Sequence, residues 1–152
     1  MATSWWALLL LTATSWLSAA DLGVKAYLVG GTVASLPQKA DGYINLTGEG
    51  ALSFVCKGNA LSIAYDKVNT LEYGQRVSRR FAEAILISPV LLLSKSRKHF
   101  VTIGYTDEEG HQQALVFRVS KGDVRTVLAG LEAKTGRRVE YQDDEARKSG
   151  KG

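Results

Sequence analysis

FVTIGYTDEEGHQQALVFRVSKGDVRTVLAGL, residues 100–131, carries the clearest structural pattern in this 152-residue chain. Its first residues, 100–105, are rich in β-branched and aromatic side chains and predict a strand. The polar run 107–110 ends in glycine and predicts a hairpin turn. On the return strand Leu115, Phe117 and Val119 alternate with their neighbours, as expected of a strand with one buried face. Residues 100–119 are therefore expected to form a β-hairpin.

The end of the same stretch predicts an amphipathic helix. Its apolar residues recur at i, i+3, i+4 and i+7, which places them on one helix face: Val124, Val127, Leu128 and Leu131. Asp123 is expected to cap the N-terminus, and Gly136 is expected to end the helix. Because so short a helix is marginal alone, it must bury this face against the sheet.

The preceding residues predict further short strands, separated by Gly, Asn and Asp. The expected strands are 25–36 with a bend at Gly30 and Gly31, 43–46, 51–56, 61–65 and 69–73. Val139 and Tyr141 are expected to add a short edge strand. The sequence therefore predicts a mainly β domain over residues 21–141, with about seven strands and a C-terminal capping helix. Residues 142–152 are charged and lack an apolar anchor, so they are expected to be a disordered tail.

The segment LSIAYDKVNTLEYG, residues 61–74, resembles the middle of bacterial pleckstrin-homology-like (PH-like) and GRAM-like domains. Residues 100–131 resemble their closing hairpin and capping helix, so the resemblance covers about half of the mature chain. It implies a half-open sandwich that binds a lipid headgroup, a peptide or a protein and performs no chemistry. Phosphoinositide-binding members carry Lys and Arg in the first interstrand loop, whereas loop 35–42 of this chain offers only Lys39.

The positive charge gathers instead in residues 76–99, RVSRRFAEAILISPVLLLSKSRKH, called the basic-apolar segment below. It contains Glu83 as its one acid and six basic residues: Arg76, Arg79, Arg80, Lys95, Arg97 and Lys98. The apolar run between the two basic clusters is shorter than the roughly 20 residues that cross a bilayer. Two interpretations follow.

In the first, Ile87, Leu91 and Leu92 lie at the tip of a loop and enter a membrane, while the flanking cations meet anionic lipid. A partner protein is the other candidate for this surface, because a monomer rarely exposes so large an apolar patch.

In the second interpretation, the segment is structural. One face of a short helix ending at Pro89 then carries Val77, Phe81, Ala84 and Ile85. A buried strand, residues 90–93, follows.

The first twenty residues contain no charged side chain and end in the small residues Ser18, Ala19 and Ala20. This pattern predicts a signal peptide cleaved before Asp21, and hence a periplasmic or secreted domain. The absence of positive charge at the start leaves an uncleaved N-terminal anchor as the alternative. The lone Cys56 is expected to be a buried apolar residue.

A different class of function, a small secreted hydrolytic enzyme or metal-dependent protein, would use the acidic residues and His111 of the region 107–111. Neighbouring residues on a tight turn point in different directions, whereas metal ligands recur at converging spacings. No G-x-S-x-G, H-E-x-x-H or phosphate-binding glycine loop occurs in the sequence. We therefore expect no catalytic residue, no cofactor and no metal.

The sequence isoelectric point of 9.2 also invites nucleic acid as a partner. The cations lie among aliphatic side chains, which offer bases no stacking platform, so nucleic acid is not the expected partner. The prediction is an exported, non-catalytic PH-like module that touches an anionic membrane surface or an unidentified protein.

Overall fold

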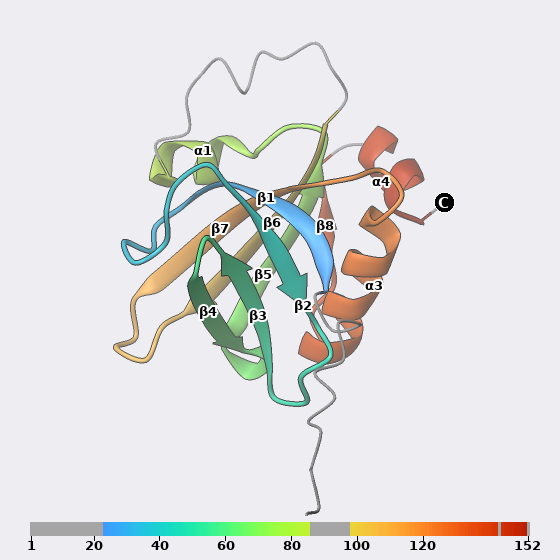
Figure 1. The fold of residues 1–152 in the computed structure, drawn as a ribbon. Coiled ribbons are helices and arrows are strands. Elements are labelled where there is room, and N and C mark those ends of the chain that lie inside the picture. The colour runs from blue at the N-terminus through green and yellow to red at the C-terminus, as the bar shows by residue number, and fades with distance from the viewer. Residues whose placement is uncertain (1–22, 86–97, 143, 152) are drawn as a thin grey trace, which may run out of the picture.

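The computed structural model describes residues 23–85, 98–142 and 144–151, which form one mixed β-sheet with helices on both sides (Figure 1). The strands are β1 (Val24–Gly31), β2 (Ala40–Asn45), β3 (Ala51–Cys56), β4 (Asn59–Ala64), β5 (Val68–Gly74), β6 (His99–Thr106), β7 (Gln112–Val119) and β8 (Glu140–Tyr141). The helices are α1 (Arg79–Ile85), α3 (Val124–Thr135) and α4 (Asp144–Lys151), with a 3₁₀ turn at Tyr65–Lys67.

The strand order is β4-β3-β2-β1-β7-β6-β5-β8. Two antiparallel meanders, β1 to β4 and β5 to β7, are joined through the pairing of β1 with β7, and β8 adds in parallel to β5. The edges β4 and β8 do not pair with each other, so the sheet stays open. The predicted mainly β class is confirmed.

Two predicted strand boundaries are wrong. The first strand ends at Gly31 and does not continue to residue 36, because the β1–β7 register shifts between Leu28 and Gly30 and the chain turns away after Gly31. Tyr65 belongs to the 3₁₀ turn and not to β4; its ring is buried there and its hydroxyl donates to the carbonyl oxygens of Leu46 and Gly48.

The main core lies on the inner face of the sheet, beneath α3. Its largest fully buried side chains include Phe54, Phe117 and Tyr73, and the Phe54 and Phe117 rings lie 4.9 Å apart. Cys56 is buried in this core, as predicted. The four apolar residues of α3 are all at most 2% exposed, so the amphipathic helix packs with the face that its spacing predicts.

Asp123 does not cap α3 with its side chain, which corrects the sequence prediction. Its carboxylate accepts a 2.6 Å hydrogen bond from Ser120 Oγ, and the Val124 N–H donates to the Ser120 carbonyl oxygen. A turn beginning at Ser120 therefore leads into the helix and provides an acceptor for its first N–H group. Gly136 ends the helix in the left-handed region with φ of 69°, where glycine is favoured.

α1 packs on the outer face of the sheet and forms a second apolar cluster there. Val77, Phe81, Ala82 and Ile85 are buried against Val29, Phe100, Ala114 and Val116. Ala84 is exposed, so the buried face of the helix passes through Ala82 and not Ala84. The first half of the basic-apolar segment is therefore structural. Ile87, Leu91, Leu92, Lys95 and Arg97 lie outside the described residues.

The end of the chain departs from the prediction of a disordered tail, because Asp144–Lys151 form α4 beside α3 (Figure 1). Ala146 is fully buried. A side-chain carbon added at Gly150 would lie 2.5 Å from the Tyr141 ring and 3.3 Å from Leu128. Ala146 and Gly150 are four residues apart and thus share a helix face. Two small residues therefore let a very polar helix pack closely without large apolar anchors.

Replacing Ala146 with Glu should detach α4, because a charged side chain cannot stay fully buried without a partner. We expect amide hydrogens of residues 144–151 to lose protection while those of β6 and β7 keep it, with a small fall in melting temperature. Ala133→Glu makes the same change at an exposed position of α3 and serves as the control. Equal protection of residues 144–151 in both variants would contradict the packing described.

Candidate functional site

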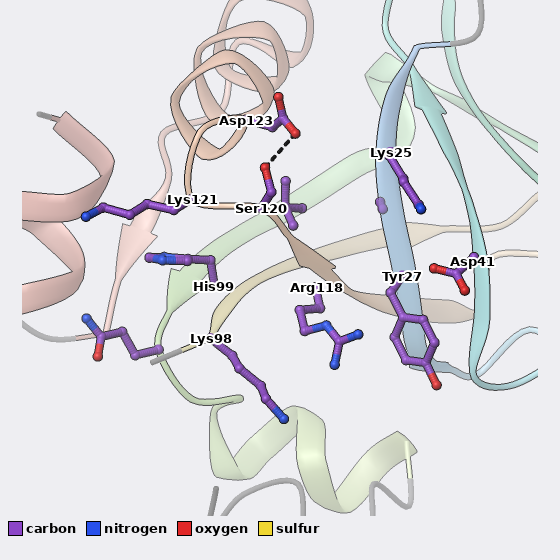
Figure 2. Close-up of a pocket in the computed structure, with 12 residues that line it drawn as sticks. Lys25, Tyr27, Asp41, Lys98, His99, Arg118, Ser120, Lys121 and Asp123 are labelled. Carbon is purple, nitrogen blue, oxygen red and sulfur yellow. Dashed lines mark hydrogen bonds between the residues drawn. The ribbon is translucent and has the colours of Figure 1, made fainter. Parts of the chain in front are cut away.

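A groove lies where β1 begins, β6 begins and β7 ends, with a volume of about 670 Å³ (Figure 2). Its lining includes four cations from three parts of the chain: Lys25, Lys98, Arg118 and Lys121. Tyr27, Asp41, Gln75, His99, Ser120 and Asp123 supply most of the remaining polar surface. We call this the basic groove.

Strand pairing brings these residues together from positions far apart in the sequence. In the β1–β7 register Tyr27 lies opposite Arg118, and in the β6–β7 register His99 lies opposite Val119. Lys98 enters just before β6, and Lys121 follows β7 in the turn that leads to α3. The β1–β7 contact therefore places cations from residues 25 and 118 in a single groove.

The cations of the basic groove have no carboxylate within 4.0 Å among the described residues. Two acids also line the groove, and one of them, Asp123, accepts a hydrogen bond from Ser120. The Arg118 guanidinium lies 4.5 Å from the centre of the Tyr27 ring, a cation–π contact that orients its donors. The groove thus presents an excess of positive charge without internal ion pairs.

His99 lies in the wall of the groove, and the residue is only 8% exposed. Its Nδ1 forms a 2.6 Å hydrogen bond with the Tyr73 hydroxyl, and the two rings are parallel, with their centres 6.1 Å apart. Burial, and to a lesser extent the nearby Lys121 ammonium, lower the pKa of His99 below its ordinary value of 6.5. The imidazole is therefore a neutral, fixed part of the wall.

The structure describes four of the six basic residues in the basic-apolar segment. Of these four, only Lys98 lines the basic groove. Arg80 pairs with the buried Glu72 carboxylate and covers the Phe81 ring, which is a structural role. Arg79 pairs with Glu83 at 2.8 Å on the exposed side of α1. Arg76 is exposed.

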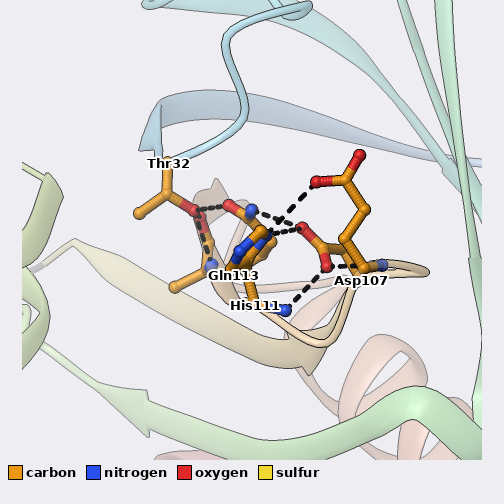
Figure 3. A network of polar contacts seen from close by, with 6 residues as sticks. Thr32, Asp107, His111 and Gln113 are labelled. Carbon is orange, nitrogen blue, oxygen red and sulfur yellow. Dashed lines mark hydrogen bonds and ion pairs between the residues drawn. The ribbon is translucent and has the colours of Figure 1, made fainter.

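The acidic hairpin between β6 and β7 is organised around Asp107 (Figure 3). Its carboxylate accepts hydrogen bonds from the backbone N–H groups of Glu109 and His111 and from the Gln113 side chain, at 2.8 to 3.0 Å. The Gln113 amide is the largest of the influences that lower the pKa of Asp107, so this carboxylate stays ionised. Gln113 in turn contacts Thr32, which ties the hairpin to the loop after β1.

Asp107 therefore closes the polar turn that the sequence predicts. The His111 Nδ1 lies 3.6 Å from Asp107 and 3.4 Å from Glu109. Across residues 23–85, 98–142 and 144–151, no group of three or more His, Cys, Asp or Glu side chains is placed to hold a metal ion.

Neither the family models nor the curated proteins with which the sequence was compared match it. In the described part of the chain, no helix has the length and apolar character needed to cross a bilayer. The geometry of the site thus carries the functional argument.

Sequence reasoning missed Lys25, Arg118 and Lys121 because they lie apart in the chain and only the β1–β7 pairing joins them. Sequence reasoning does not single out His99, which is buried. A signal for its burial was present, since it shares strand parity with Val101, Ile103 and Tyr105, all of which face the core.

The buried His99 should make stability depend on pH. Above pH 6.5 the imidazole is neutral in both folded and unfolded chains; below it the unfolded chain takes up the proton first, because the folded-state pKa is lower. The free energy of unfolding should therefore fall as pH decreases below 6.5, until the folded-state pKa is passed. Urea unfolding across this range should show the slope in the wild type and a reduced slope in His99→Gln. An unchanged slope would show that another group is responsible.

Proposed function

We propose that this chain is a non-catalytic, PH-like binding module whose basic groove docks on an anionic phospholipid surface. The observation that carries the proposal is the convergence of Lys25, Lys98, Arg118 and Lys121, with no ion-pair partner among the described residues, in one groove. Unpaired cations gathered on one surface of a protein attract a negatively charged membrane surface.

The PH-like assignment is supported by the order of elements. Two antiparallel meanders are followed by an amphipathic helix that covers the core, which is the arrangement implied by the resemblance of residues 61–74 and 100–131. The groove lies at the start of β1 and not in the loop after β1, where Lys39 remains the lone cation. The proposed lipid contact therefore uses a different surface from the headgroup pocket that the resemblance implies.

Charge number sets the strength of such a contact. Each Lys or Arg near an anionic membrane contributes about 1 kcal/mol, so four cations supply a reversible attachment. Salt screens this attraction, since the Debye length is about 10 Å at 0.1 M ionic strength. Arg79 and Arg80 contribute less to this contact, because each already has a carboxylate partner.

Nucleic acid is the competing polyanion, and the lining of the groove disfavours it. Tyr27 is the one phenolic ring in the lining, and the Arg118 guanidinium already covers it. His99 is held parallel to Tyr73 with its ring buried. The lining therefore lacks the series of open aromatic faces on which successive bases stack.

We further propose that the domain is exported, which places it beside a membrane surface. Support comes from the uncharged N-terminal segment and the small residues Ser18, Ala19 and Ala20, which lie outside the described residues.

Vesicle flotation tests the lipid contact. The triple variant Lys25→Gln, Lys98→Gln, Lys121→Gln should bind vesicles of phosphatidylglycerol and phosphatidylcholine about 100-fold more weakly than the wild type, since three cations at about 1 kcal/mol each are lost. Binding of the wild type should weaken with salt and vanish on phosphatidylcholine alone.

The control variant Lys67→Gln, Arg138→Gln, Lys148→Gln removes the same charge from exposed positions outside the groove. It should lose much less affinity than the groove variant. Equal losses of vesicle affinity in the two variants would show a general effect of net charge and not a specific groove. Equal recovery of the wild type and both variants with the vesicles would contradict the proposal.

A further inference from the structure

We propose that the free edge of β4 is a docking site for an extended peptide from a partner protein, which pairs with it as an added strand. The proposed peptide alternates apolar side chains and carries a basic residue at one end. This surface is separate from the basic groove, and no residue lines both.

The backbone geometry identifies which groups of β4 are free. Lys57 and Gly58 form a two-residue turn with positive φ at both positions, and the Tyr65 N–H donates to the Gly50 carbonyl oxygen at 3.0 Å. The alternation of antiparallel pairs then puts Asn59, Leu61 and Ile63 in the hydrogen-bonded pairs with β3.

The N–H and C=O groups of Ala60, Ser62 and Ala64 consequently point away from β3. β4 is the last strand of the sheet on this side, so no neighbouring strand among the described residues pairs with these groups. The Ala64 carbonyl is the exception, because Ala64 is the N-cap of the 3₁₀ turn and its carbonyl accepts the first hydrogen bond of that turn. The main chain of β4 is therefore a template for one more strand.

Within residues 23–85, 98–142 and 144–151, this edge lacks the usual protection against pairing. β4 contains no charged residue and no proline, and its outward residues are all small: Ala60, Ser62 and Ala64. Natural edge strands are commonly blocked by lysine, proline, bulges or a covering element. The opposite edge, β8, follows that rule, being two residues long and in contact with α4. An unprotected edge of six residues indicates a partner.

A small groove runs beside this edge and offers side-chain pockets. Its apolar wall includes Val33, Leu61, Ile63 and Tyr105, and its volume is about 250 Å³. Ligand sites for small molecules usually measure 300–1,000 Å³, so this groove fits one or two side chains of an added strand better than a free small molecule.

Acidic side chains at one end of the small groove favour a basic residue at the corresponding end of the peptide. Asp107 and Glu108 line one part of the groove, with Lys67 as the one cation in the lining. The Asp107 carboxylate is held ionised by its hydrogen bonds, because these lower its pKa. A Lys or Arg of the peptide would therefore be attracted to this end, and an acid would be repelled.

The outer face of the same half-sheet supplies a second contact. Tyr43 and Val55 are the large apolar side chains exposed in the described residues, at 38% and 45%. They lie opposite each other, and Val55 is opposite Ala60 of β4. An apolar side chain on the outer face of an added strand would extend this row, as cross-strand pairs do within a sheet.

A second copy of this chain is a poorer occupant. The antiparallel self-pairing that engages all three outward residues is centred on Ser62. That register brings Lys57 of each copy next to Lys67 of the other, a like-charge contact that opposes pairing.

The test uses a phage-displayed library of random dodecapeptides panned against the full chain, with amide hydrogen exchange as the readout. Enriched peptides should alternate apolar residues and carry Lys or Arg at one end. They should slow exchange at Ala60, Ser62 and Ala64 and leave the groove residue Lys25 unchanged. Ser62→Pro removes an outward N–H without touching the β3 pairing and should weaken binding about tenfold or more.

Ser62→Lys and Ser53→Lys form a matched pair that avoids proline. The two serines lie opposite each other on the same face, but only Ser62 is on the edge. Binding should fall for Ser62→Lys and stay within about twofold for Ser53→Lys. Glu108→Lys should shift the preference of the enriched peptides from basic to acidic residues.

Three results would overturn the proposal. They are an absence of enriched peptides, enriched peptides that bind Ser62→Pro and Ser62→Lys as tightly as wild type, and a wild-type dimer that Ser62→Pro dissociates. The last would assign the edge to a second copy. Failure of the vesicle experiment leaves this test intact, because the two surfaces share no lining residue.

Discussion

The pairing of β1 with β7 is the contact on which the rest of the structure depends. It joins residues 26–31 to residues 115–119 and is the one strand pair that links the two meanders. Without it, β1 to β4 would be a four-stranded sheet with one face of its core uncovered, and Phe54 would lose Phe117. Pairing two strands so far apart in the sequence has an entropic cost of loop closure. The burial of Leu28, Leu115 and Phe117 in the joint core must offset this cost.

The same pairing determines what each face of the sheet does. Residues of one parity in β1, β6 and β7 enter the core beneath α3, and those of the other parity meet α1. This outer face would be exposed without α1, so Val77, Phe81 and Ile85 are needed to cover Val29 and Val116. The apolar character at the start of the basic-apolar segment is therefore explained by packing, and its cations at Arg79 and Arg80 by ion pairs.

Much of the local structure could be predicted from the sequence, because periodicity reports which face of an element is buried. The α3 face and the β6–β7 hairpin follow from spacing alone. α4 could not be predicted, because close packing through Ala146 and Gly150 depends on Tyr141 and Leu128 in other elements. The basic groove could not be predicted from the sequence for a related reason. Its cations are ordinary surface residues until the pairing of β1 with β7 brings Lys25 and Arg118 into one groove.

The open sheet accounts for one of the two proposed surfaces. A closed barrel would leave no free edge, so β4 is free because β4 and β8 do not meet. The basic groove does not depend on this opening, since it lies in the middle of the sheet, at the ends of the paired strands β1, β7 and β6. The two surfaces differ in chemistry. One gathers unpaired cations for an anionic surface, and the other offers main-chain groups, small side chains and two carboxylates to an extended peptide. Because they share no lining residue, the two proposed contacts depend on different side chains.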